Sequence, residues 1–443
     1  MLVNHKAVMK KISSHKGTTA IWGLSSSTKT FFTKHPKQIK FIDYIIDNNT
    51  LLHGETFQEK PIISLENALD KKDLQIVLLG NHIIDILSQI KDYNFTNFLI
   101  DYEYSRNYFP KDLIIELDYV YFDKVIPFCN AIVEYCKEKA IQCHIKPYEY
   151  SNWPMHETKE SVFNNIVAID IKPPKNTLVF STHTIGKSNS QIFRWKIGYL
   201  DKTITFDETG YSGWSSLAKN PEIAFTRSIT KSMVERNFKK LQNHYIAKNI
   251  SKYEQTHSNF IFPERFIFFP LQTLNDTVML QSNFDPFTLI NHIIEMLYKK
   301  GIPLVVKRHP FCDNKLLEKI LFNYEKQKKI ILFNGSIHDA LSKASTIYVI
   351  NSGVGFEALM HLKPVVTFGK SDYMSVTKHI TNLEEIDKNP WYAIDDEKRD
   401  KIKLFLHYFI HEKCIDLTNK KDIKNKITSF VVNYLNKEYY GNK

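Results

Sequence analysis

Short apolar runs alternate with amphipathic stretches along the carboxyl-terminal half of the chain. The runs 265-RFIFFPLQ-272 and 302-IPLVVKRHP-310 predict buried strands. The stretch 284-FDPFTLINHIIEMLYKKG-301 places apolar residues every three or four positions and predicts a helix that ends at its glycine. Ser336, with Asp339 three residues later, predicts the start of another helix. Because repeated strand–helix units form parallel sheets covered on both faces, this half predicts an α/β domain.

The amino-terminal half shows the same alternation less regularly. Residues 19-TAIWGLSSSTKTFF-32 predict a strand, a glycine turn and a helix. They lack the second glycine of a GxxxxGK[ST] phosphate loop, so a turn that feeds a helix is the favoured interpretation. Farther along, the patterns predict a helix over 117–141, a strand, polar loop and helix over 176–198, a loop over 204–222 and helical periodicity over 221–253.

These patterns predict α/β structure in both halves and a polar hinge between them, 251-SKYEQTHSNFIFPE-264. The closing segment 420–443 is basic with an apolar stripe. We expect it to pack back on the amino-terminal domain, and contact with an anionic membrane surface is the alternative. The expected boundaries are 1–105 for an amino-terminal α/β segment, 106–260 for the rest of that domain, 261–385 for the carboxyl-terminal domain and 386–443 for terminal helices.

Composition narrows the class of ligand. The chain has 443 residues, and its formal charge of +11 suits a phosphorylated or otherwise anionic partner. The lysines are scattered rather than gathered in blocks, which disfavours nucleic acid. Five cysteines without CxxC pairing indicate reduced thiols in a cytoplasmic protein. We expect neither a signal peptide nor a membrane span.

Three polar segments follow predicted strands, where open parallel sheets bind ligands. In 351-NSGVGFEAL-359, Ser352 would cap a helix whose free N–H groups and dipole favour a phosphate. Gly353 and Gly355 would let that ligand approach the backbone, and Glu357 would accept ribose hydroxyls. The alternative is an ordinary capped helix with a surface glutamate.

The other two segments carry opposite charges. Lys307, Arg308 and His309 suit a pyrophosphate or phosphodiester leaving group, whereas a charged strand end is the plain alternative. In 270-PLQTLNDT-277, Asp276 is a candidate base or nucleophile, although capping of a helix is the favoured interpretation from the residues alone. Gln272 of the same segment is a weaker candidate for sugar binding.

The loop 206-FDETGYSGWSS-216 is a candidate carbohydrate site. Its carboxylates Asp207 and Glu208 lie near the aromatic rings of Tyr211 and Trp214. An Ω-loop packed by its own rings is the alternative. The chain contains no DxD triplet, so we expect a mechanism that uses no metal.

Together these segments resemble a known family. "KRHP" and "SIHDALSKASTIYVINSGVGFEALMHLKPVVTFGKSDY" are similar to the carboxyl-terminal half of bacterial capsule and lipopolysaccharide transferases that use CMP-Kdo, where Kdo is 3-deoxy-D-manno-oct-2-ulosonic acid. "WKIGYLDKTITFDETGYSGWSSLA" resembles their amino-terminal half. The HP and Ser-Gly-x-Gly-x-Glu elements also resemble bacterial sialyltransferases, which use CMP-sialic acid.

The resemblance implies a GT-B fold, with two Rossmann-like domains facing across a cleft, and retaining transfer through a covalent glycosyl-enzyme. It implies that Asp276 is the nucleophile and that His309 lies near the departing phosphate. Glu208 would handle the acceptor proton, and Asp207 remains an alternative. Lys307, Arg308 and the helix end at Ser352 would stabilise the leaving CMP.

The resulting prediction is a cytoplasmic Kdo transferase of capsule or lipopolysaccharide O-antigen biosynthesis. Its partners would be CMP-Kdo as donor and a free or lipid-linked saccharide as acceptor, with peripheral contact to the inner membrane, no nucleic acid and no cofactor. One alternative is an inverting sialyltransferase of similar architecture. An alternative from another class is a non-catalytic nucleotide- or nucleic-acid-binding protein on the same scaffold.

Overall fold

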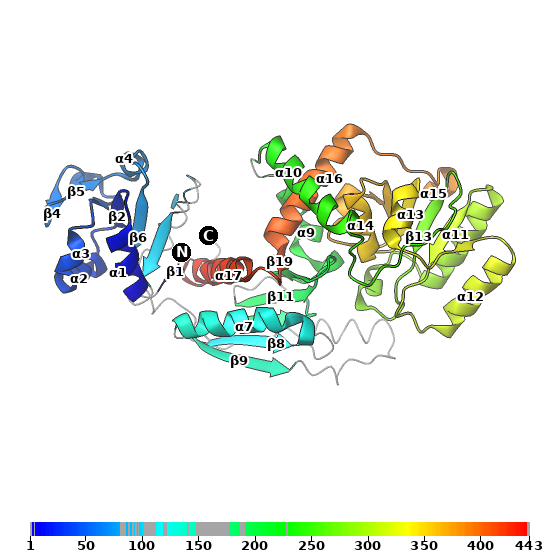
Figure 1. Ribbon diagram of the computed structural model, residues 1–443, viewed down its shortest axis with the longest axis horizontal. Helices are drawn as coiled ribbons and strands as arrows, with labels where there is room; N and C mark the ends of the chain where they lie inside the picture. The colour runs from blue at the N-terminus through cyan, green and yellow to red at the C-terminus, as the bar shows by residue number, and fades with distance from the viewer. Residues whose placement is uncertain are drawn as a thin grey trace.

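The computed structural model of the chain describes residues 2–3, 5–79, 86, 89–90, 93, 95, 97–101, 112–117, 122–139, 141–147, 177–186, 191–226 and 229–440. These residues form three sheets; Figure 1 shows the first at one end of the long axis and the third at the other. The α/β fold class predicted from the sequence is confirmed. The five cysteines are free thiols.

The first sheet has the strand order β1-β7-β6-β2-β3-β5-β4, and β4 is antiparallel to β5. Gly23, with a φ of +85°, turns the chain from β2 into α2, which Ser25 caps. The amide of Leu24 donates to Asp47, so the predicted turn is confirmed and this amide is already bonded. The elements are β1 (Leu2–Val3), α1 (His5–Ser14), β2 (Thr19–Trp22), α2 (Ser26–Lys34), α3 (Pro36–Ile39), β3 (Tyr44–Ile46), η1 (Thr50–Leu52), β4 (Thr56–Phe57), β5 (Lys60–Ile63), α4 (Leu65–Leu69), β6 (Gln75–Leu78) and β7 (Phe98–Asp101).

The second sheet is mixed, with the order β19-β12-β11-β10-β8-β9. Strands β8 to β11 pair in parallel, whereas β12 is antiparallel to both β11 and β19. The helix predicted over 117–141 is confirmed as α7, whose Phe128 packs on Phe180 and Phe206. The elements are β8 (Asp112–Leu117), α7 (Phe122–Lys139), β9 (Gln142–Pro147), β10 (Thr177–Thr182), β11 (Ile192–Ile197) and β12 (Thr203–Asp207).

Two sequence predictions in this sheet are wrong. The helix predicted towards the end of 176–198 is strand β11, and the predicted loop over 204–222 begins with the end of strand β12. Strand β11 has partners on both sides, so its backbone groups are paired and its side chains are buried almost throughout. Arg194 of this strand is buried and donates to the carbonyl oxygen of Glu208 at 2.5 Å.

The third sheet is parallel throughout, with the order β15-β14-β13-β16-β17-β18. Every strand and helix predicted here is confirmed. Gly301 ends α11 with a φ of +64°, and Ser336 accepts the amide of His338 at the start of α13. The elements are β13 (Ile267–Pro270), α11 (Pro286–Lys299), β14 (Leu304–Lys307), α12 (Lys315–Lys326), β15 (Ile331–Leu332), α13 (Ile337–Lys343), β16 (Thr346–Val349), α14 (Gly353–Met360), β17 (Val365–Thr367) and β18 (Lys378–His379).

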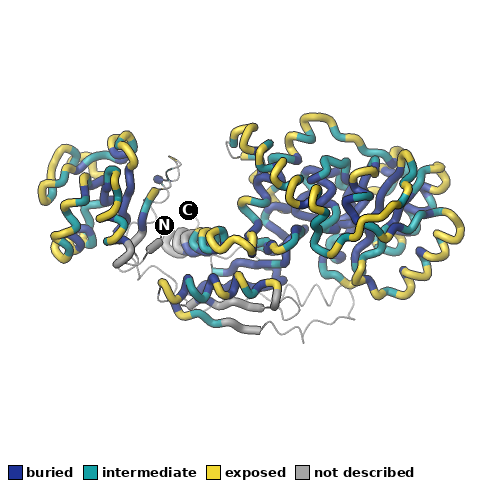
Figure 2. Tube along the Cα trace, viewed as in Figure 1, coloured by how far each residue is buried: buried dark blue, intermediate teal, exposed yellow. Residues whose placement is uncertain are grey.

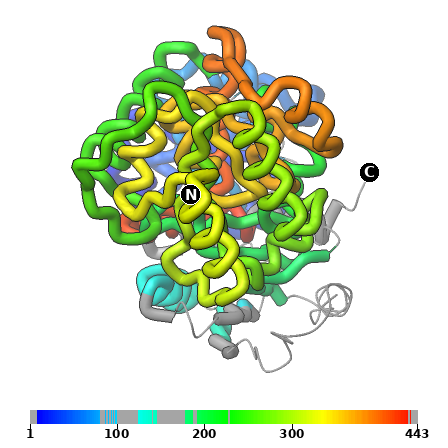
Figure 3. The backbone as a smooth tube through the Cα atoms, turned by 90° about the vertical axis from the view of Figure 1, so that its right-hand side faces the viewer, coloured from blue at the N-terminus to red at the C-terminus, as the bar shows by residue number. Residues whose placement is uncertain are grey.

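Successive side chains along each strand point to opposite faces of this sheet. Phe266 and Phe268 join the cluster with α13, α14 and α16, whereas Ile267 and Phe269 join the cluster with α11 and α12. Figure 2 shows the buried chain running through the middle of this layer, and Figure 3 views the molecule from this end. The alternation explains why near-continuous apolar runs predict these strands.

Helical segments link the second and third sheets. Helix α10 confirms the periodicity predicted over 221–253, and the predicted hinge 251–264 contains no helix or strand. The segments are η5 (Ser212–Trp214), α9 (Ser216–Lys219), η6 (Pro221–Ala224), α10 (Lys231–Leu241) and the π-helical η7 (Gln242–Ile246), followed within the third sheet by η8 (Thr277–Gln281) and η9 (Met374–Val376).

The chain returns to the second sheet at its carboxyl end. Helix α17 packs against α7, and Ile427 and Val431 of its apolar stripe are fully buried. Lys420 pairs with Glu134 at 2.8 Å across these helices. The part of the stripe whose side chains are described is therefore covered by protein, as expected of a helix that packs back on the preceding domain. The closing elements are α15 (Glu384–Lys388), α16 (Asp396–Tyr408), the π-helical η10 (Phe409–Lys413), β19 (Cys414–Asp416) and α17 (Lys420–Tyr440).

Candidate functional site

A pocket of about 290 Å³ lies at the carboxyl ends of β13, β14 and β16. Its opposite wall comes from β11 and the β12 loop of the second sheet, and the hinge segment Ser251–Gln255 closes one side. Nine of the predicted site residues line it: Tyr211, Gln272, Asp276, Lys307, Arg308, His309, Ser352, Gly353 and Glu357. The topology brings these distant segments together because the ends of parallel strands meet at one edge.

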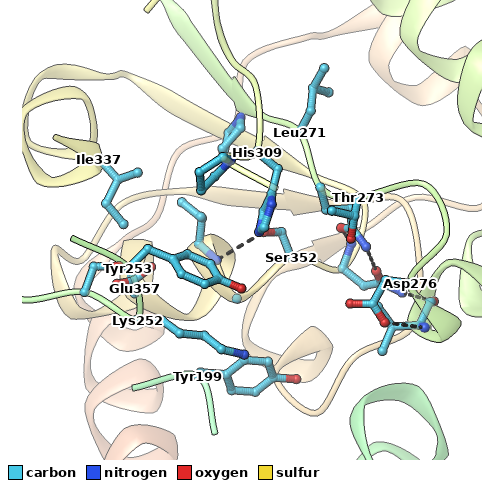
Figure 4. A pocket seen from close by; sticks show the side chains of 18 of the residues that line it. Tyr199, Lys252, Tyr253, Leu271, Thr273, Asp276, His309, Ile337, Ser352 and Glu357 are labelled. Atoms are coloured by element: carbon cyan, nitrogen blue, oxygen red, sulfur yellow. Dashed lines mark hydrogen bonds between the residues drawn. The ribbon is translucent and has the colours of Figure 1, made fainter. Parts of the chain in front are cut away.

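Asp276 combines two of the alternatives drawn from the sequence. Its side chain accepts the amide of Val278 at 3.1 Å and so caps η8, yet it also faces the pocket (Figure 4). Burial would raise the pKa of Asp276, but the Lys196 ammonium, 3.8 Å from Oδ1, and the Val278 amide hold that pKa below its ordinary value. The carboxylate is therefore ionised at neutral pH, as a nucleophile or base must be.

The cations of the KRHP segment are largely engaged by the protein. Lys307 Nζ donates to the carbonyl oxygen of Gly335 at 2.7 Å. Arg308 donates to the carbonyl oxygen of Cys312 at 2.6 Å and lies 3.5 Å from a carboxylate oxygen of Glu318. Both residues line the pocket, but their charged ends also brace the strand end and the loop that follows it.

His309 faces the pocket as a neutral donor. Burial lowers the pKa of His309, against the opposing effect of Asp276. Its Nδ1 accepts the amide of Phe311 at 3.1 Å, so the neutral ring carries its proton on Nε2. The Tyr253 ring meets the imidazole edge-on with centroids 5.1 Å apart and fixes its orientation. The ring can therefore donate a hydrogen bond to an anion.

Helix α14 begins at the pocket. Ser352 Oγ accepts the amide of Val354 at 3.3 Å, so the predicted cap is confirmed. Gly353 lines the pocket, whereas Gly355 lies outside it: a Cβ there would come within 2.5 Å of the Tyr373 hydroxyl oxygen. Gly355 is thus explained by packing. The amides of Val354 and Gly355 are bonded to Ser352, so it is the positive end of the helix dipole that favours an anion here.

Glu357 is a buried pocket residue rather than a surface glutamate. Only 3% of it is exposed, and its Oε1 has no hydrogen-bond partner within the described part of the chain. Burial raises the pKa of Glu357 to about 8, although Ser251 and Lys252 oppose that rise. The carboxyl group is therefore mostly protonated at neutral pH and can both donate and accept hydrogen bonds.

The two loop carboxylates do not line the pocket. Asp207 is buried. Its Oδ1 accepts hydrogen bonds from the amide and hydroxyl of Thr209 and from the amides of Gly210 and Ser216. Its Oδ2 accepts from the Ser216 hydroxyl and lies 2.9 Å from Lys413 Nζ. These contacts make it a bracing residue. Glu208 follows it on the same loop, outside the pocket lining. Its predicted role in proton transfer stays a prediction.

The remaining sugar-binding candidates have structural contacts. Tyr211 donates or accepts a hydrogen bond with Thr277 at 2.8 Å and lines the pocket, whereas Trp214 packs on Tyr211 outside the lining. The rings thus pack within the loop, as its Ω-loop alternative predicts. Gln272 lines the pocket but bonds Asn351 at 2.8 Å and ties two strand ends together.

Sequence reasoning missed several pocket residues that bear charged or hydroxyl groups, among them Lys196, Tyr199, Lys252 and Asp372. Lys252 lies in a segment that we interpreted only as a hinge, and Lys196 in one that we predicted as a helix. Tyr199 donates to Asp372 at 2.8 Å, and burial raises the pKa of Asp372 to about 6. For Lys196 the sequence held one signal. In a strand over Ile192–Ile197, Lys196 and the buried Trp195 point to opposite faces of the sheet.

Two further properties concern metals and membranes. The described residues hold no group of three His, Cys, Asp or Glu side chains that could bind a metal ion. None of the helices described is long and apolar enough to cross a bilayer.

The fold is α/β, and a pocket lined by several lysine and arginine side chains lies between two of its sheets, as predicted for a GT-B-like architecture. Residues 205–411 match the model of the family described as capsule polysaccharide biosynthesis protein. The resemblance predicted from the sequence is confirmed at this level. No curated protein matches the chain.

Solved structures similar to the chain include two KpsC domains of Thermosulfurimonas dismutans. The β Kdo 2,7 transferase is 16% identical, with a TM-score of 0.39 over 72% of this chain and 98% of that one. The β Kdo 2,4 transferase is 16% identical, with a TM-score of 0.45 over 73% of this chain and 99% of that one. The UDP-GlcNAc 2-epimerase of Methanocaldococcus jannaschii is 13% identical, with a TM-score of 0.27 over 72% and 99%. The family match and the pocket therefore carry the functional proposal.

Proposed function

We propose that this protein is a glycosyltransferase that moves Kdo from CMP-Kdo to a saccharide acceptor in capsule or lipopolysaccharide O-antigen assembly. The observation that carries the proposal is the ionised Asp276 in the same pocket as the amino end of α14 and the neutral His309. A carboxylate suits attack on an electron-poor sugar carbon, and the helix end with a neutral imidazole suits a departing phosphate. The family match over 205–411 supports the class of reaction.

The proposed reaction has two displacements. An oxygen of Asp276 bonds to C2 of Kdo as the bond from C2 to the CMP phosphate oxygen breaks, and CMP leaves with the electron pair. The acceptor hydroxyl then displaces the carboxylate, loses its proton to a base, and restores the original configuration. Glu208 remains the proposed base, because Asp207 is held by Lys413 and its own loop. No metal takes part.

Polar groups around the leaving CMP would lower the barrier of the first displacement. The positive end of the α14 dipole would stabilise the phosphate, and the Nε2–H of His309 would donate to it. The protonated Glu357 would bond the ribose hydroxyls. The acceptor would be a saccharide, free or lipid-linked, and the reaction would occur in the cytoplasm, with peripheral contact at the inner membrane.

Intact-mass measurement tests the nucleophile. The protein is mixed with CMP-Kdo without acceptor, and a covalent Kdo adduct is expected on a peptide that contains Asp276. Asp276→Ala should abolish the adduct. Asp313→Ala, which changes an exposed aspartate outside the pocket lining, is the matched control and should retain it.

The same experiment with CMP-sialic acid separates the donors. An adduct with CMP-Kdo alone supports a Kdo transferase. Hydrolysis of CMP-sialic acid without any adduct would support the inverting sialyltransferase instead. Absence of hydrolysis and of adducts with both donors would contradict the proposed function.

A further inference from the structure

Lys196 projects from β11 of the second sheet into the pocket formed mainly by the third. Its Nζ lies 3.8 Å from Asp276 Oδ1 and 4.7 Å from the centre of the Tyr211 ring. Only 19% of the Lys196 side chain is exposed, so these two contacts fix the ammonium beside the proposed nucleophile. Lys196 thus carries a positive charge across the cleft.

Lys252 brings a second ammonium to the same space. Figure 4 shows its side chain running beside Tyr199 into the pocket below Tyr253. Burial and the charge of Lys196 lower the pKa of Lys252 to about 8, whereas Asp276 opposes that fall. Within the described residues the Lys252 ammonium has no carboxylate at ion-pair distance. Two lysines therefore share one ionised carboxylate.

The remaining pocket carboxyl groups do not balance this charge. Glu357 is mostly protonated at neutral pH, since its pKa is about 8. Asp372, which accepts a hydrogen bond from Tyr199, and Glu254 of the hinge segment also line the pocket, but Lys307 and Arg308 match these two carboxylates in number. An enclosed site with surplus positive charge is stabilised by an anionic ligand group. Lys307 and Arg308 are already bonded to backbone carbonyl oxygens, so Lys196 and Lys252 are the cations best placed for it.

We propose that Lys196, with Lys252 beside it, binds the carboxylate of the transferred sugar, so that the pocket selects sugar-acid donors over neutral sugars. This inference rests on the proposed function and names what the same site recognises. In a 2-keto sugar acid the carboxylate is bonded to the carbon that Asp276 would attack. Attack therefore brings two carboxylates within a few Å, and their repulsion would oppose the step unless a cation lay between them. Lys196 lies beside Asp276, where it can contact both.

The test compares CMP-Kdo with its C1 carboxamide, which keeps the shape but removes the charge. Donor hydrolysis is followed as kcat/KM with the full-length protein. The wild type should prefer the carboxylate by about 10- to 100-fold, the usual range for a charged hydrogen bond. Lys196→Gln should lose most of this preference, and Lys252→Gln part of it. Lys196→Arg, which keeps the charge, should retain it.

The ratio of kcat/KM for CMP-Kdo to kcat/KM for the carboxamide shows whether Lys196 recognises the donor carboxylate or has only a structural role. If Lys196 only positioned Asp276, Lys196→Gln would lower kcat/KM equally for both donors, and an unchanged ratio overturns the inference. Lys248→Gln is the control, because Lys248 is exposed four residues before Lys252. The affinity for CMP, measured by calorimetry, should be unchanged in Lys196→Gln. If the wild type hydrolyses neither donor, the proposed function fails and the inference fails with it.

Discussion

Asp207 and Lys413 form a buried ion pair, with Asp207 Oδ2 2.9 Å from Lys413 Nζ although 206 residues separate them. The pair joins the β12 loop to the π-helical turn that follows α16. Ser216 bonds both partners, so the whole loop depends on the charge of Asp207.

Asp207→Ala should lower the free energy of unfolding by about 3–5 kcal/mol, because it leaves the buried Lys413 ammonium without its partner. Urea unfolding followed by circular dichroism measures the loss. The double variant Asp207→Ala/Lys413→Met should lose less than the sum of the single variants. Additive losses would contradict the bracing role of the pair.

Gly355→Ala should lower the free energy of unfolding by about 1–3 kcal/mol, since the added methyl group would meet the Tyr373 ring and hydroxyl. Thermal unfolding measures the change. Adding Tyr373→Phe should recover part of that loss by removing the nearest atom, although the variant also loses the hydrogen bond from Tyr373 to the Ser352 carbonyl oxygen. If the double variant loses at least as much free energy of unfolding as the two single variants together, the added methyl group does not clash with the Tyr373 hydroxyl.

Glu357→Gln should stabilise the protein increasingly as pH rises. Burial raises the pKa of Glu357 from 4.5 to about 8, so the folded state holds this proton more tightly than the unfolded chain does. The free energy of unfolding of the wild type therefore falls between pH 4.5 and 8, and glutamine removes this loss. Urea unfolding at pH 5 and pH 8 should show that the glutamine variant exceeds the wild type in free energy of unfolding by about 3–5 kcal/mol at the higher pH.

The gap at pH 5 should be small, because the carboxyl group is then protonated in the folded state and partly protonated in the unfolded chain. Glu264→Gln, at an exposed position, is the control and should show no such trend. A pH-independent difference for Glu357→Gln would contradict a buried, protonated carboxyl group.

His309→Gln should reduce kcat for hydrolysis of CMP-Kdo by about 100- to 10,000-fold, the usual range for a group that donates to a leaving group. Because the pKa of His309 lies below its ordinary value, the neutral ring predominates at pH 7, and since both protonation states keep the Nε2–H, protonation of His309 should not lower the wild-type rate between pH 8 and pH 5. Initial rates from pH 5 to 8 measure both effects. His244→Gln, at an exposed site, should retain the wild-type rate, and equal rates for His309→Gln would contradict the assigned role.

The residues of the candidate site could be predicted wherever they follow strands of the third sheet. Asp276, His309 and Ser352 each come directly after a regular apolar run, and parallel topology puts such positions at one edge. The sequence could not show that the charged ends of Lys307 and Arg308 bind backbone oxygens of Gly335 and Cys312. Those contacts depend on the path of loops that have no repeating pattern.

By itself, the sequence determined the parallel sheet and the helices around it. In β13 the alternation of Phe266 and Phe268 with Ile267 and Phe269 meets an apolar layer on each face, so local pattern and burial agree. Only the tertiary structure decided that Ile192–Ile197 is a strand, because its partners β10 and β12 satisfy backbone groups that local sequence leaves undecided. The same pairing delivers Lys196 to Asp276, a contact between residues 80 positions apart that no local period encodes.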